Sequence, residues 1–340
     1  MKLGWRGALG LVLSAALLVW TLRGVDAAGV SAALAAADPV LLLASAAAAT
    51  AIFPLRAVRW RIILEPIAPG LPFGPRWRAT AIGMMVNNVL PARAGEVARA
   101  YALTREVPQV PFSAAFASMA VDRTFDAMVL LLLLCVAVVD PAFPGGTRVA
   151  GQPIANWAGG AAVVLAGVLA ALYAVALFPA RILGVYQLLT QRLPPRVADR
   201  GRDALLAFAA GLGALRSPRR FAAVLWWTTL HWLLNAFAFW LAFRAVAMDV
   251  PASAALFLQS VIAFGVALPS SPGFFGVFEA AAKVGLAVYG VGDTLAVTWA
   301  IGFHLLSFIP ITVIGGYYFS RLGLRLGEVQ AAVPRADAGS

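Results

Sequence analysis

Long apolar runs dominate this chain and limit what it can fold into. Ala127–Val139, Ala158–Phe178 and Phe221–Ala247, taken with their flanks, each supply the roughly 20 residues that a helix needs to cross a hydrocarbon core. Hydrophobic residues make up 62% of the 340 residues and charged residues only 12%. These proportions exclude a pair of ordinary soluble domains and predict an all-α polytopic membrane protein.

The apolar pattern predicts about six transmembrane helices in a single membrane domain. The predicted spans lie near residues 5–22, 39–56, 112–139, 156–178, 221–247 and 293–319. The first span begins like a signal peptide, but the spans that follow favour an uncleaved helix. The domain is predicted to cover residues 1–328, with halves at about 39–139 and 221–319, a basic connection at 179–220 and a disordered tail at 329–340.

The distribution of Lys and Arg gives this arrangement an orientation. Most of them fall in segments that share one side of the membrane, and Arg56 and Arg59 are counted there, between spans two and three. The other side holds Arg23, Arg148, Arg244 and Lys283. Because cytoplasmic loops are enriched in basic residues, both termini are predicted to be cytoplasmic, in a bacterial-type cytoplasmic (inner) membrane.

The net charge of +11 follows from the same asymmetry, and no segment builds the basic soluble face that a nucleic-acid partner would need. The connection 179–220 mixes Arg and Asp with Ala and Leu. It predicts a short amphipathic helix at the anionic cytoplasmic surface. Ordinary positive-inside charge explains its basic residues more simply than a specific lipid site.

Two further apolar stretches, 79–90 and 252–268, are too short to span. At about 1.5 Å per residue the first reaches only about 18 Å of the roughly 30 Å core. It then meets Pro91, which interrupts the helical hydrogen bonds. With their continuations 94–105 and 274–290, the two stretches are predicted to form re-entrant helical hairpins.

The two hairpins occupy corresponding places in a repeated pattern. LRAV at 55–58 and FRAV at 243–246 are each followed by a short apolar helix, an LP pair, a Gly and then Glu96 or Glu279. The two units run in opposite directions, which predicts an inverted repeat. In transporters, broken helices at such positions place free backbone groups near the bilayer midplane.

The first hairpin tip, NNVLPARAGEVARAY at 87–101, carries most of the candidate polar site. Arg93 can contact a phosphate with two parallel hydrogen bonds. Glu96 is expected to pair with Arg93 or Arg99 until a ligand arrives, and Pro91 and Gly95 are expected to break the helix. The alternative is a turn held only by internal ion pairs. The candidate residues are Asn87, Asn88, Pro91, Arg93, Gly95, Glu96 and Arg99.

The third span carries Asp122, Arg123 and Asp126, the two acids at i and i+4 on one helix face. Buried carboxylates need partners, and Arg93 and Arg99 are the expected ones. Structural pairing is favoured over a proton relay, which stays open.

The second hairpin tip is small, kinked and poor in charge. Its candidate residues are Ser270, Ser271, Pro272, Gly273, Gly276 and Glu279. Lys283 follows Glu279 at i+4, so an ordinary helix ion pair is the alternative to a role for the acid in the site. His304 in the last span is expected to be a packing residue. With one Cys and two His, no metal site and no cofactor are expected.

Four strings in order, RAVRWRIIL, NNVLPARAGEVARAY, VDRTFD and LPSSPGFFGVFEA, resemble the lysylphosphatidylglycerol synthase transmembrane-region family of flippase-like integral membrane proteins. The resemblance covers roughly residues 5–325, and the most specific part is N-x-x-L-P-x-R-x-G-E-x-x-R at 87–99, which includes Asn88. The family's Glu-Arg-x-x-Asp appears as Asp122 to Asp126. Its Pro-Gly-Gly-x-Gly-x-x-Glu appears as Pro272 to Glu279, with Phe274 for the second Gly, which makes that turn less permissive.

The resemblance implies translocation of a membrane lipid with an anionic or zwitterionic headgroup, and stand-alone relatives are linked to hopanoids and polyprenyl carriers. Because the chain ends near residue 340 without the cytoplasmic synthase domain, it is expected not to be a synthase, and no enzymatic activity is expected. No GxxxxGK[ST] motif is present, so ion coupling or a lipid gradient would supply energy. The alternative is a non-transporting accessory subunit that holds a lipid for a partner lipid-modifying enzyme.

Overall fold

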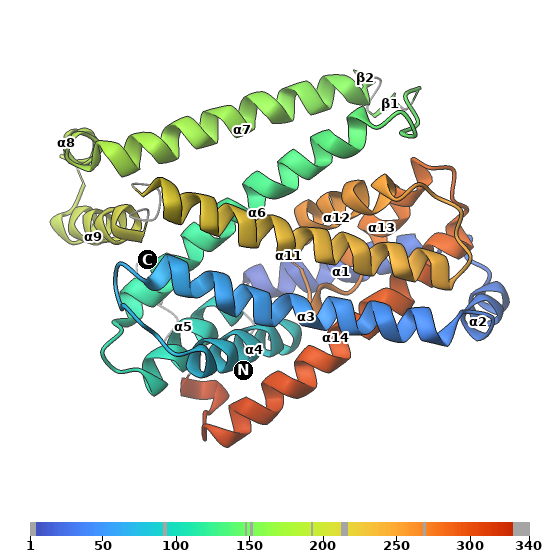
Figure 1. Ribbon diagram of the computed structural model, residues 1–340, viewed down its shortest axis with the longest axis horizontal. Coiled ribbons are helices and arrows are strands. Elements are labelled where there is room, and N and C mark those ends of the chain that lie inside the picture. Colours follow the sequence, from blue (N-terminus) through green and yellow to red (C-terminus); the bar gives the residue numbers. More distant parts are fainter. Residues whose placement is uncertain are drawn as a thin grey trace.

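The computed structural model describes residues 5–90, 94–146, 148–149, 152–191, 193–211, 217–267 and 270–328, and helices make up most of them (Figure 1). The helices are α1 Trp5–Leu22, α2 Ala27–Ala35, α3 Pro39–Leu64, α4 Phe73–Val89, α5 Gly95–Glu106, α6 Phe112–Val139, α7 Ile154–Leu177, α8 Pro179–Thr190, α9 Pro195–Gly211, α11 Pro218–Ala245, α12 Ser253–Gly265, α13 Val277–Ala287 and α14 Asp293–Arg321. A two-stranded antiparallel ladder joins β1 Arg148–Val149 to β2 Gln152–Pro153, with Arg148 opposite Pro153.

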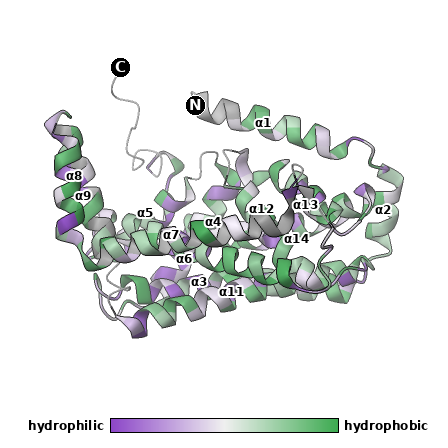
Figure 2. Cartoon of the chain, turned by 90° about the horizontal axis from the view of Figure 1, so that it is seen from above, coloured by the Kyte–Doolittle hydropathy of each residue, from purple (hydrophilic) through white to green (hydrophobic). Residues whose placement is uncertain are grey.

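Hydrophobic residues predominate along most of the helices (Figure 2). Within the described residues, α3 and α14 are long and apolar enough to cross a membrane, and α1 from Gly10 with α2 makes a third candidate, bent by 83°. Large hydrophobic side chains point outward, such as Val40, Leu43 and Val313, which are 71%, 69% and 65% exposed. Apolar surface of this extent suits contact with lipid.

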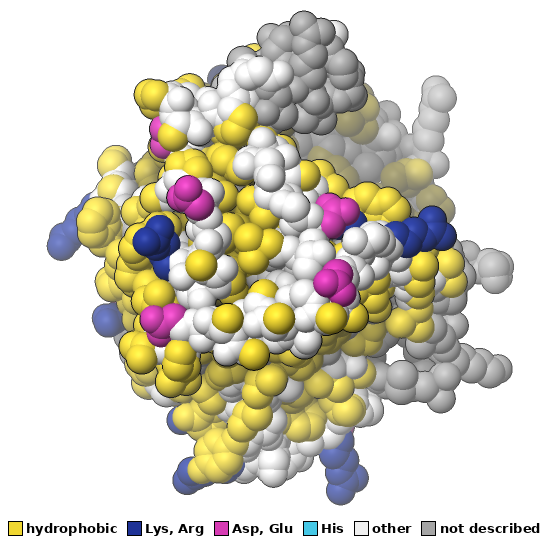
Figure 3. Space-filling view, turned by 90° about the vertical axis from the view of Figure 1, so that its right-hand side faces the viewer, with side chains coloured by type: hydrophobic (Ala, Val, Ile, Leu, Met, Phe, Trp, Pro, Cys, Tyr) yellow, Lys and Arg dark blue, Asp and Glu magenta, His cyan; other side chains and the backbone are white. Residues whose placement is uncertain are grey.

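The long helices α3, α6, α7, α11 and α14 extend between two ends of the molecule (Figure 1). The helix α2 and the connections 140–146 and 246–252 lie at one end, and α8 and α9 lie at the other (Figure 1). Seen from the α2 end, a few charged side chains stand among hydrophobic ones (Figure 3). The helix expected in the basic connection corresponds to α9, and α8 precedes it.

Two short helix pairs form where the hairpins were expected. The arms α4 and α5 pack together on the side of α8 and α9, while α12 and α13 pack together on the side of α2 (Figure 1). Between the second pair lies a 3-10 turn, η1, at Pro272–Phe274. The helix α14 contacts both α4 and α13, so the two pairs meet along it.

Each half of the chain supplies most of one hydrophobic cluster. Trp60, Leu103 and Phe125 belong to the cluster around α3, α4, α5 and α6. Phe243 and Trp299 belong to the cluster around α11, α12, α13 and α14.

The helix α3 is longer than its predicted span, which ended at residue 56. Asp38 caps its start by accepting hydrogen bonds from the amides of Val40 and Leu41, and the helix continues to Leu64. The positive-inside count placed Arg56 and Arg59 in a loop, and this is wrong because both lie buried inside the helix. Carboxylates within the protein pair with these charges, so the helix tolerates them.

Gly315 allows α14 to approach α4 closely. A Cβ at this position would collide with the carbonyl oxygen of Ala81 and the side chain of Met85. Gly315→Ala is therefore expected to destabilise the protein by about 1 to 3 kcal/mol, as overpacking does. The measurement is the thermal unfolding midpoint of purified protein in detergent.

Gly316 is the matched control on the same helix, because a Cβ there meets nothing within 4 Å among the described residues. Gly316→Ala is expected to be neutral or to stabilise by about 0.5 to 1 kcal/mol, since Ala favours a helix over Gly. Equal midpoints for the two variants would contradict close α14–α4 packing.

Candidate functional site

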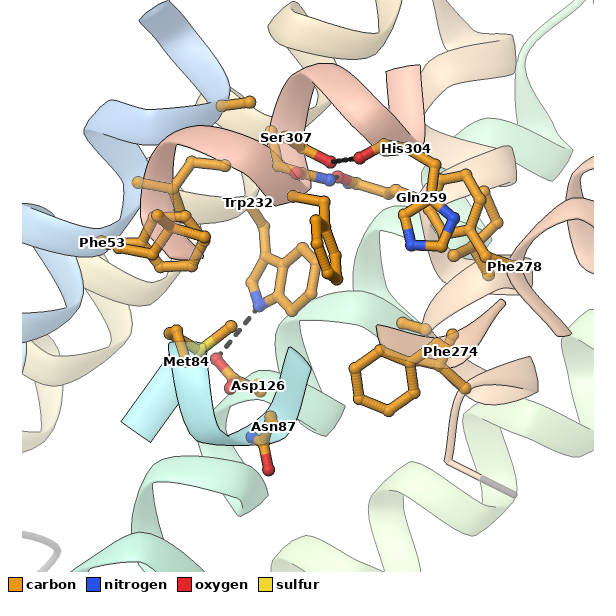
Figure 4. Close-up of a pocket in the computed structure, with 18 of the residues that line it drawn as sticks. Phe53, Met84, Asn87, Asp126, Trp232, Gln259, Phe274, Phe278, His304 and Ser307 are labelled. Atoms are coloured by element: carbon orange, nitrogen blue, oxygen red, sulfur yellow. Dashed lines mark hydrogen bonds between the residues drawn. The ribbon is translucent and has the colours of Figure 1, made fainter. Parts of the chain in front are cut away.

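Both short helix pairs reach one cavity of about 470 Å³ in the centre of the bundle (Figure 4). Asn87 and Asn88 at the end of α4 reach it from one pair, and Gly273 and Phe274 in η1 reach it from the other. Helices α3, α6, α11, α12 and α14 complete its wall. A cavity of this size suits a small ligand or one part of a larger one.

A cluster of buried charges forms one pole of the cavity. Asp126 of α6 accepts hydrogen bonds from Arg59 Nη1 at 2.6 Å and Arg56 Nη2 at 3.2 Å, both on α3. The indole of Trp232 on α11 donates to the same carboxylate at 3.1 Å (Figure 4). His231 Nδ1 lies 3.9 Å away. The Arg59 side chain is fully buried and Asp126 is 4% exposed, so these charges exist only because they are paired.

Asp122, one helical turn earlier, extends the cluster toward the first hairpin. It is paired with Arg59 and accepts a hydrogen bond from Arg99 Nη1 on α5 at 3.1 Å. The Arg99 guanidinium also lies over the ring of Trp60, 4.0 Å from its centroid. The expected pairing of Asp122 with Arg99 is thus present, but Arg56 and Arg59 supply most of the positive charge around both acids.

The cluster holds more positive than negative charge among the described residues. Its guanidinium groups are Arg56, Arg59, Arg99 and Arg123, and its carboxylates are Glu96, Asp122 and Asp126. Arg56 lines the cavity, and its Nε has no hydrogen-bond partner in the part of the chain that is described. Buried donors of this kind cost free energy unless a ligand or water satisfies them. The cavity therefore has an excess of positive charge in its wall, which favours an anion.

The tip of the first hairpin is held by amide side chains. Asn87 Oδ1 accepts a hydrogen bond from the Gly95 amide at 2.8 Å, and Asn88 Nδ2 donates to Thr312 Oγ1 on α14 at 2.6 Å. Gly95 was expected to break the helix, but it begins α5 and lies against Gly83 with no room for a Cβ. Its role is close packing of α5 on α4.

Glu96 was expected to pair with Arg93 or Arg99, but it does not pair with Arg99. Its Oε1 accepts a hydrogen bond from Arg123 Nη2 at 2.9 Å, which ties α5 to α6. Both groups line the cavity. Pro91 and Arg93 lie outside the described residues, so the phosphate contact expected of Arg93 stays a prediction.

The second hairpin tip is tied to α14 by a histidine. His304 Nδ1 lies 2.6 Å from Glu279 Oε1, and His304 Nε2 lies 2.8 Å from the carbonyl oxygen of Gly273. Glu279 Oε2 also accepts the Gly276 amide at 2.7 Å, which caps α13. Phe274 adopts φ +64°, a left-handed conformation that costs a non-glycine residue about 1 to 2 kcal/mol. The expectation of a less permissive turn at this Phe agrees with that geometry.

The expected Glu279–Lys283 ion pair is absent. Lys283 Nζ instead lies 2.9 Å from Asp293 Oδ2 and donates to the carbonyl oxygen of Thr21 at 3.1 Å. The reason is geometric, because His304 and the Gly276 amide already occupy the Glu279 carboxylate. Likewise His304, expected to be a packing residue, lines the cavity.

The remaining candidate residues of the second tip do not line the cavity, and Ser270, Ser271 and Gly276 contact α1 instead. The Ser271 amide donates to Ser14 Oγ at 2.8 Å, and the Ser270 backbone lies against Gly10. Gly276, at φ +84°, leaves no room for a Cβ next to the Ser14 carbonyl. Pro272 begins η1.

Sequence reasoning missed several polar residues of the cavity. Asn235 on α11 donates to Gln259 Oε1 on α12 at 3.0 Å, and both line the wall. Trp232 was not among the candidates, and Arg56 was counted between spans two and three. The string RAVRWR did contain a signal for Arg56. Its arginines at i and i+3 share one helix face at the end of an apolar run, so they could pair with the two acids at i and i+4 on one face of another span. Candidates that do line the cavity are Asn87, Asn88, Glu96, Arg123, Asp126 and Gly273.

An apolar helical bundle with paired charges around an internal cavity defines an α-helical membrane protein with a polar interior site. The chain belongs to the lysylphosphatidylglycerol synthase TM region family, whose profile matches residues 7–315. This confirms the resemblance drawn from the motifs. Within the described residues, no group of three or more His, Cys, Asp and Glu side chains could hold a metal ion.

Two named relatives are similar over most of the chain. The Glycosyltransferase AglD of Haloferax volcanii is 28% identical over 330 residues, which cover 90% of this chain and 53% of that protein. The chain thus spans about half the length of this relative. The UPF0104 membrane protein of Methanothermobacter thermautotrophicus is 25% identical over 309 residues, covering 83% of this chain and 84% of that protein.

Proposed function

We propose that the protein is a lipid translocase of the flippase type, which moves a phospholipid or another lipid with a phosphate headgroup between the leaflets of the cytoplasmic membrane. The observation that carries the proposal is the single cavity that both hairpin tips line, with excess positive charge at one pole. In transporters, a site formed by broken helices from two halves lies on the substrate path.

The headgroup phosphate would bind at the Arg56 side of the cavity. Arg56 faces the cavity and has a free Nε, and Arg123 lies in the same wall at 43% side-chain exposure. A guanidinium offers a planar pair of donors that matches a phosphate. Glu96 and Asp126 hold these arginines in place before the ligand arrives.

The rest of the lipid would lie against apolar surface. Away from the charged cluster, the cavity wall consists largely of aliphatic and aromatic side chains, among them Ile52, Phe53, Phe239 and Phe303. The cavity is too small for a whole phospholipid, so the acyl chains would stay in the bilayer while the headgroup passes through.

The proposal includes a membrane arrangement. The helices α1, α3, α6, α7, α11 and α14 are assigned as six spans, and the pairs α4–α5 and α12–α13 as re-entrant hairpins of an inverted repeat, with both termini cytoplasmic. Support comes from the positions of the two pairs, which lie toward opposite ends of the long helices (Figure 1). Transport needs no catalytic residue or cofactor, and we propose no enzymatic activity for this chain.

The relative named a glycosyltransferase favours a second candidate. Since the aligned region covers 53% of that protein, this chain corresponds to one part of it. Such a part could hold a lipid for glycosyl transfer by a separate or attached enzyme without moving it across the bilayer. A lipid-binding accessory role of this kind would use the same cavity.

The deciding experiment is leaflet exchange of fluorescent lipids in proteoliposomes of purified protein. Phosphatidylglycerol, aminoacyl-phosphatidylglycerol and polyprenyl phosphate are compared with a neutral diacylglycerol. The expected result is exchange of at least one phosphate lipid at a rate well above empty vesicles, with no exchange of diacylglycerol. Binding of a phosphate lipid by folded protein without exchange would support the accessory role instead.

A further inference from the structure

The hydrogen-bond partners of His304 constrain which of its ring nitrogens carry a hydrogen. A backbone carbonyl can only accept a hydrogen bond, so His304 Nε2, 2.8 Å from the Gly273 oxygen, must carry a hydrogen. The opposite nitrogen, Nδ1, lies 2.6 Å from Glu279 Oε1. A hydrogen bond between these two atoms requires one further proton, either on the imidazole or on the carboxyl group, since neither can donate without it.

The pair is buried in apolar surroundings, where a net charge costs free energy. Glu279 and His304 are 2% and 5% exposed. The imidazole stacks on Phe278, with ring centroids 4.4 Å apart, and lies 4.6 Å from the ring of Phe275. With the shared proton the pair is neutral overall, and without it the pair carries a buried negative charge.

We propose that His304, which lines the cavity, and Glu279, which is buried and does not line it, form a proton-binding site that takes up and releases one proton as the occupancy of the cavity changes. In the uptake step a proton from cavity water adds to a lone pair of Glu279 Oε1 or His304 Nδ1, and no other covalent bond changes. The coupling to cargo rests on the proposed function, whereas the proton site itself does not.

The helices next to the Glu279–His304 pair bring few other titratable groups near it. The described part of α1 from Gly10 onward, α2 and α12 carry no titratable side chain, and those of α4 are Arg76 and Arg78 near its start. Lys283, one turn further along α13, is held by Asp293. On α11, His231 lies next to Asp126.

The opposite wall of the same cavity carries the charged cluster. The titratable groups that line the same cavity as His304 are Arg56, Glu96, Arg123 and Asp126. An anion bound at that cluster would oppose a negative charge on the pair, so it would favour the protonated form. By linkage, protonation would favour the anion equally.

The acidic pair of α6 fits a proton relay less well than this site. Asp126 is held by Arg56 and Arg59, and Asp122 is held by Arg59 and Arg99. Protonating either acid would leave buried guanidinium groups facing a neutral group. Protonating the Glu279–His304 pair breaks no ion pair with a third residue.

The test is ¹⁵N NMR of the full-length protein labelled at histidine, in lipid nanodiscs, as a function of pH. The chain contains two histidines, so His231→Gln and His304→Gln assign both imidazoles. The expected result is a His304 spectrum that changes with pH as the shared proton is gained and lost. Glu279→Gln is expected to move this change to at least about a tenfold higher proton concentration.

A second arm adds short-chain phosphatidylglycerol, with inorganic phosphate and short-chain diacylglycerol as separate probes. Phosphatidylglycerol is expected to move the His304 change to a proton concentration about threefold to tenfold lower. The matched control, Glu65→Gln, removes a partly exposed carboxylate at the helix end of α3 and should leave the His304 response unchanged.

The outcomes distinguish a failure of the proton-binding site from a failure of the proposed lipid translocation. His304 resonances that stay constant over the pH range, in the wild-type protein and in Glu279→Gln alike, would overturn the proton site even if lipid exchange is observed. A pH response without any leaflet exchange would support the proton site and count against the proposed function. A pH response that phosphatidylglycerol does not move would overturn the coupling.

Discussion

Asp126→Asn is expected to destabilise the protein by about 3 to 5 kcal/mol, the usual cost of removing one partner from a buried ion pair. The substitution keeps the side-chain volume but removes the charge that faces Arg56 and Arg59. Arg59 is fully buried and cannot turn toward solvent. The positive excess of the cluster would also grow, so neighbouring guanidinium groups would repel each other more strongly.

The measurement is the thermal or denaturant midpoint in detergent, followed by tryptophan fluorescence. Glu65→Gln is the matched control, because its partner Arg61 lies at 3.7 Å and the two side chains are 31% and 56% exposed, so little stability should be lost. A midpoint for Asp126→Asn as close to wild type as that of Glu65→Gln would contradict the role given to this cluster.

A double-mutant cycle with Arg59→Gln isolates the ion pair from general packing loss. If Arg59 and Asp126 stabilise each other, the double variant should be less destabilised than the sum of the two single variants. Additive losses would mean that each residue acts through other contacts, such as the bond from Arg59 Nη1 to Thr228 Oγ1 at 3.0 Å.

The sequence was sufficient to predict where the helices lie. Long apolar runs can satisfy their backbone only as helices, so α6 and α14 fall close to the predicted spans. The two short pairs were also located correctly, because their apolar runs are too short to cross a membrane and the second is followed by the Pro-Gly turn at 272–273. The helix α2 was missed because its Ala-rich sequence of nine residues resembles an ordinary connection.

Side-chain partners were harder to predict than helices. The positive-inside pattern counts charges along the chain and cannot distinguish an arginine in a loop from one paired inside the protein, so Arg56 and Arg59 were misplaced. The pairing of Glu279 was mistaken for a similar reason. An i+4 lysine is visible in the sequence, whereas His304 reaches this acid only because α13 packs on α14.

Arg56→Gln is expected to slow exchange of the transported phosphate lipid by about 10- to 100-fold. A hydrogen bond to a charged group contributes about 1.5 to 3 kcal/mol, and 1.4 kcal/mol corresponds to a factor of ten. Arg56 is the cavity-lining arginine with a free buried donor among the described residues, whereas Arg59 is not part of the cavity wall. Losing Arg56 also lowers the excess positive charge of the cluster, so the fold should suffer less than in Asp126→Asn.

Arg56→Lys separates charge from geometry, because Lys keeps the charge without the planar pair of donors. An intermediate rate is expected for this variant, and the exposed Arg61→Gln serves as the matched control with exchange near wild type. The assay is the proteoliposome leaflet exchange described above, at equal amounts of folded protein. Wild-type exchange by Arg56→Gln would show that the phosphate does not bind at this pole. If both Arg56→Gln and Arg61→Gln lost exchange equally, general surface charge would explain the loss, because of these two arginines only Arg56 lines the cavity.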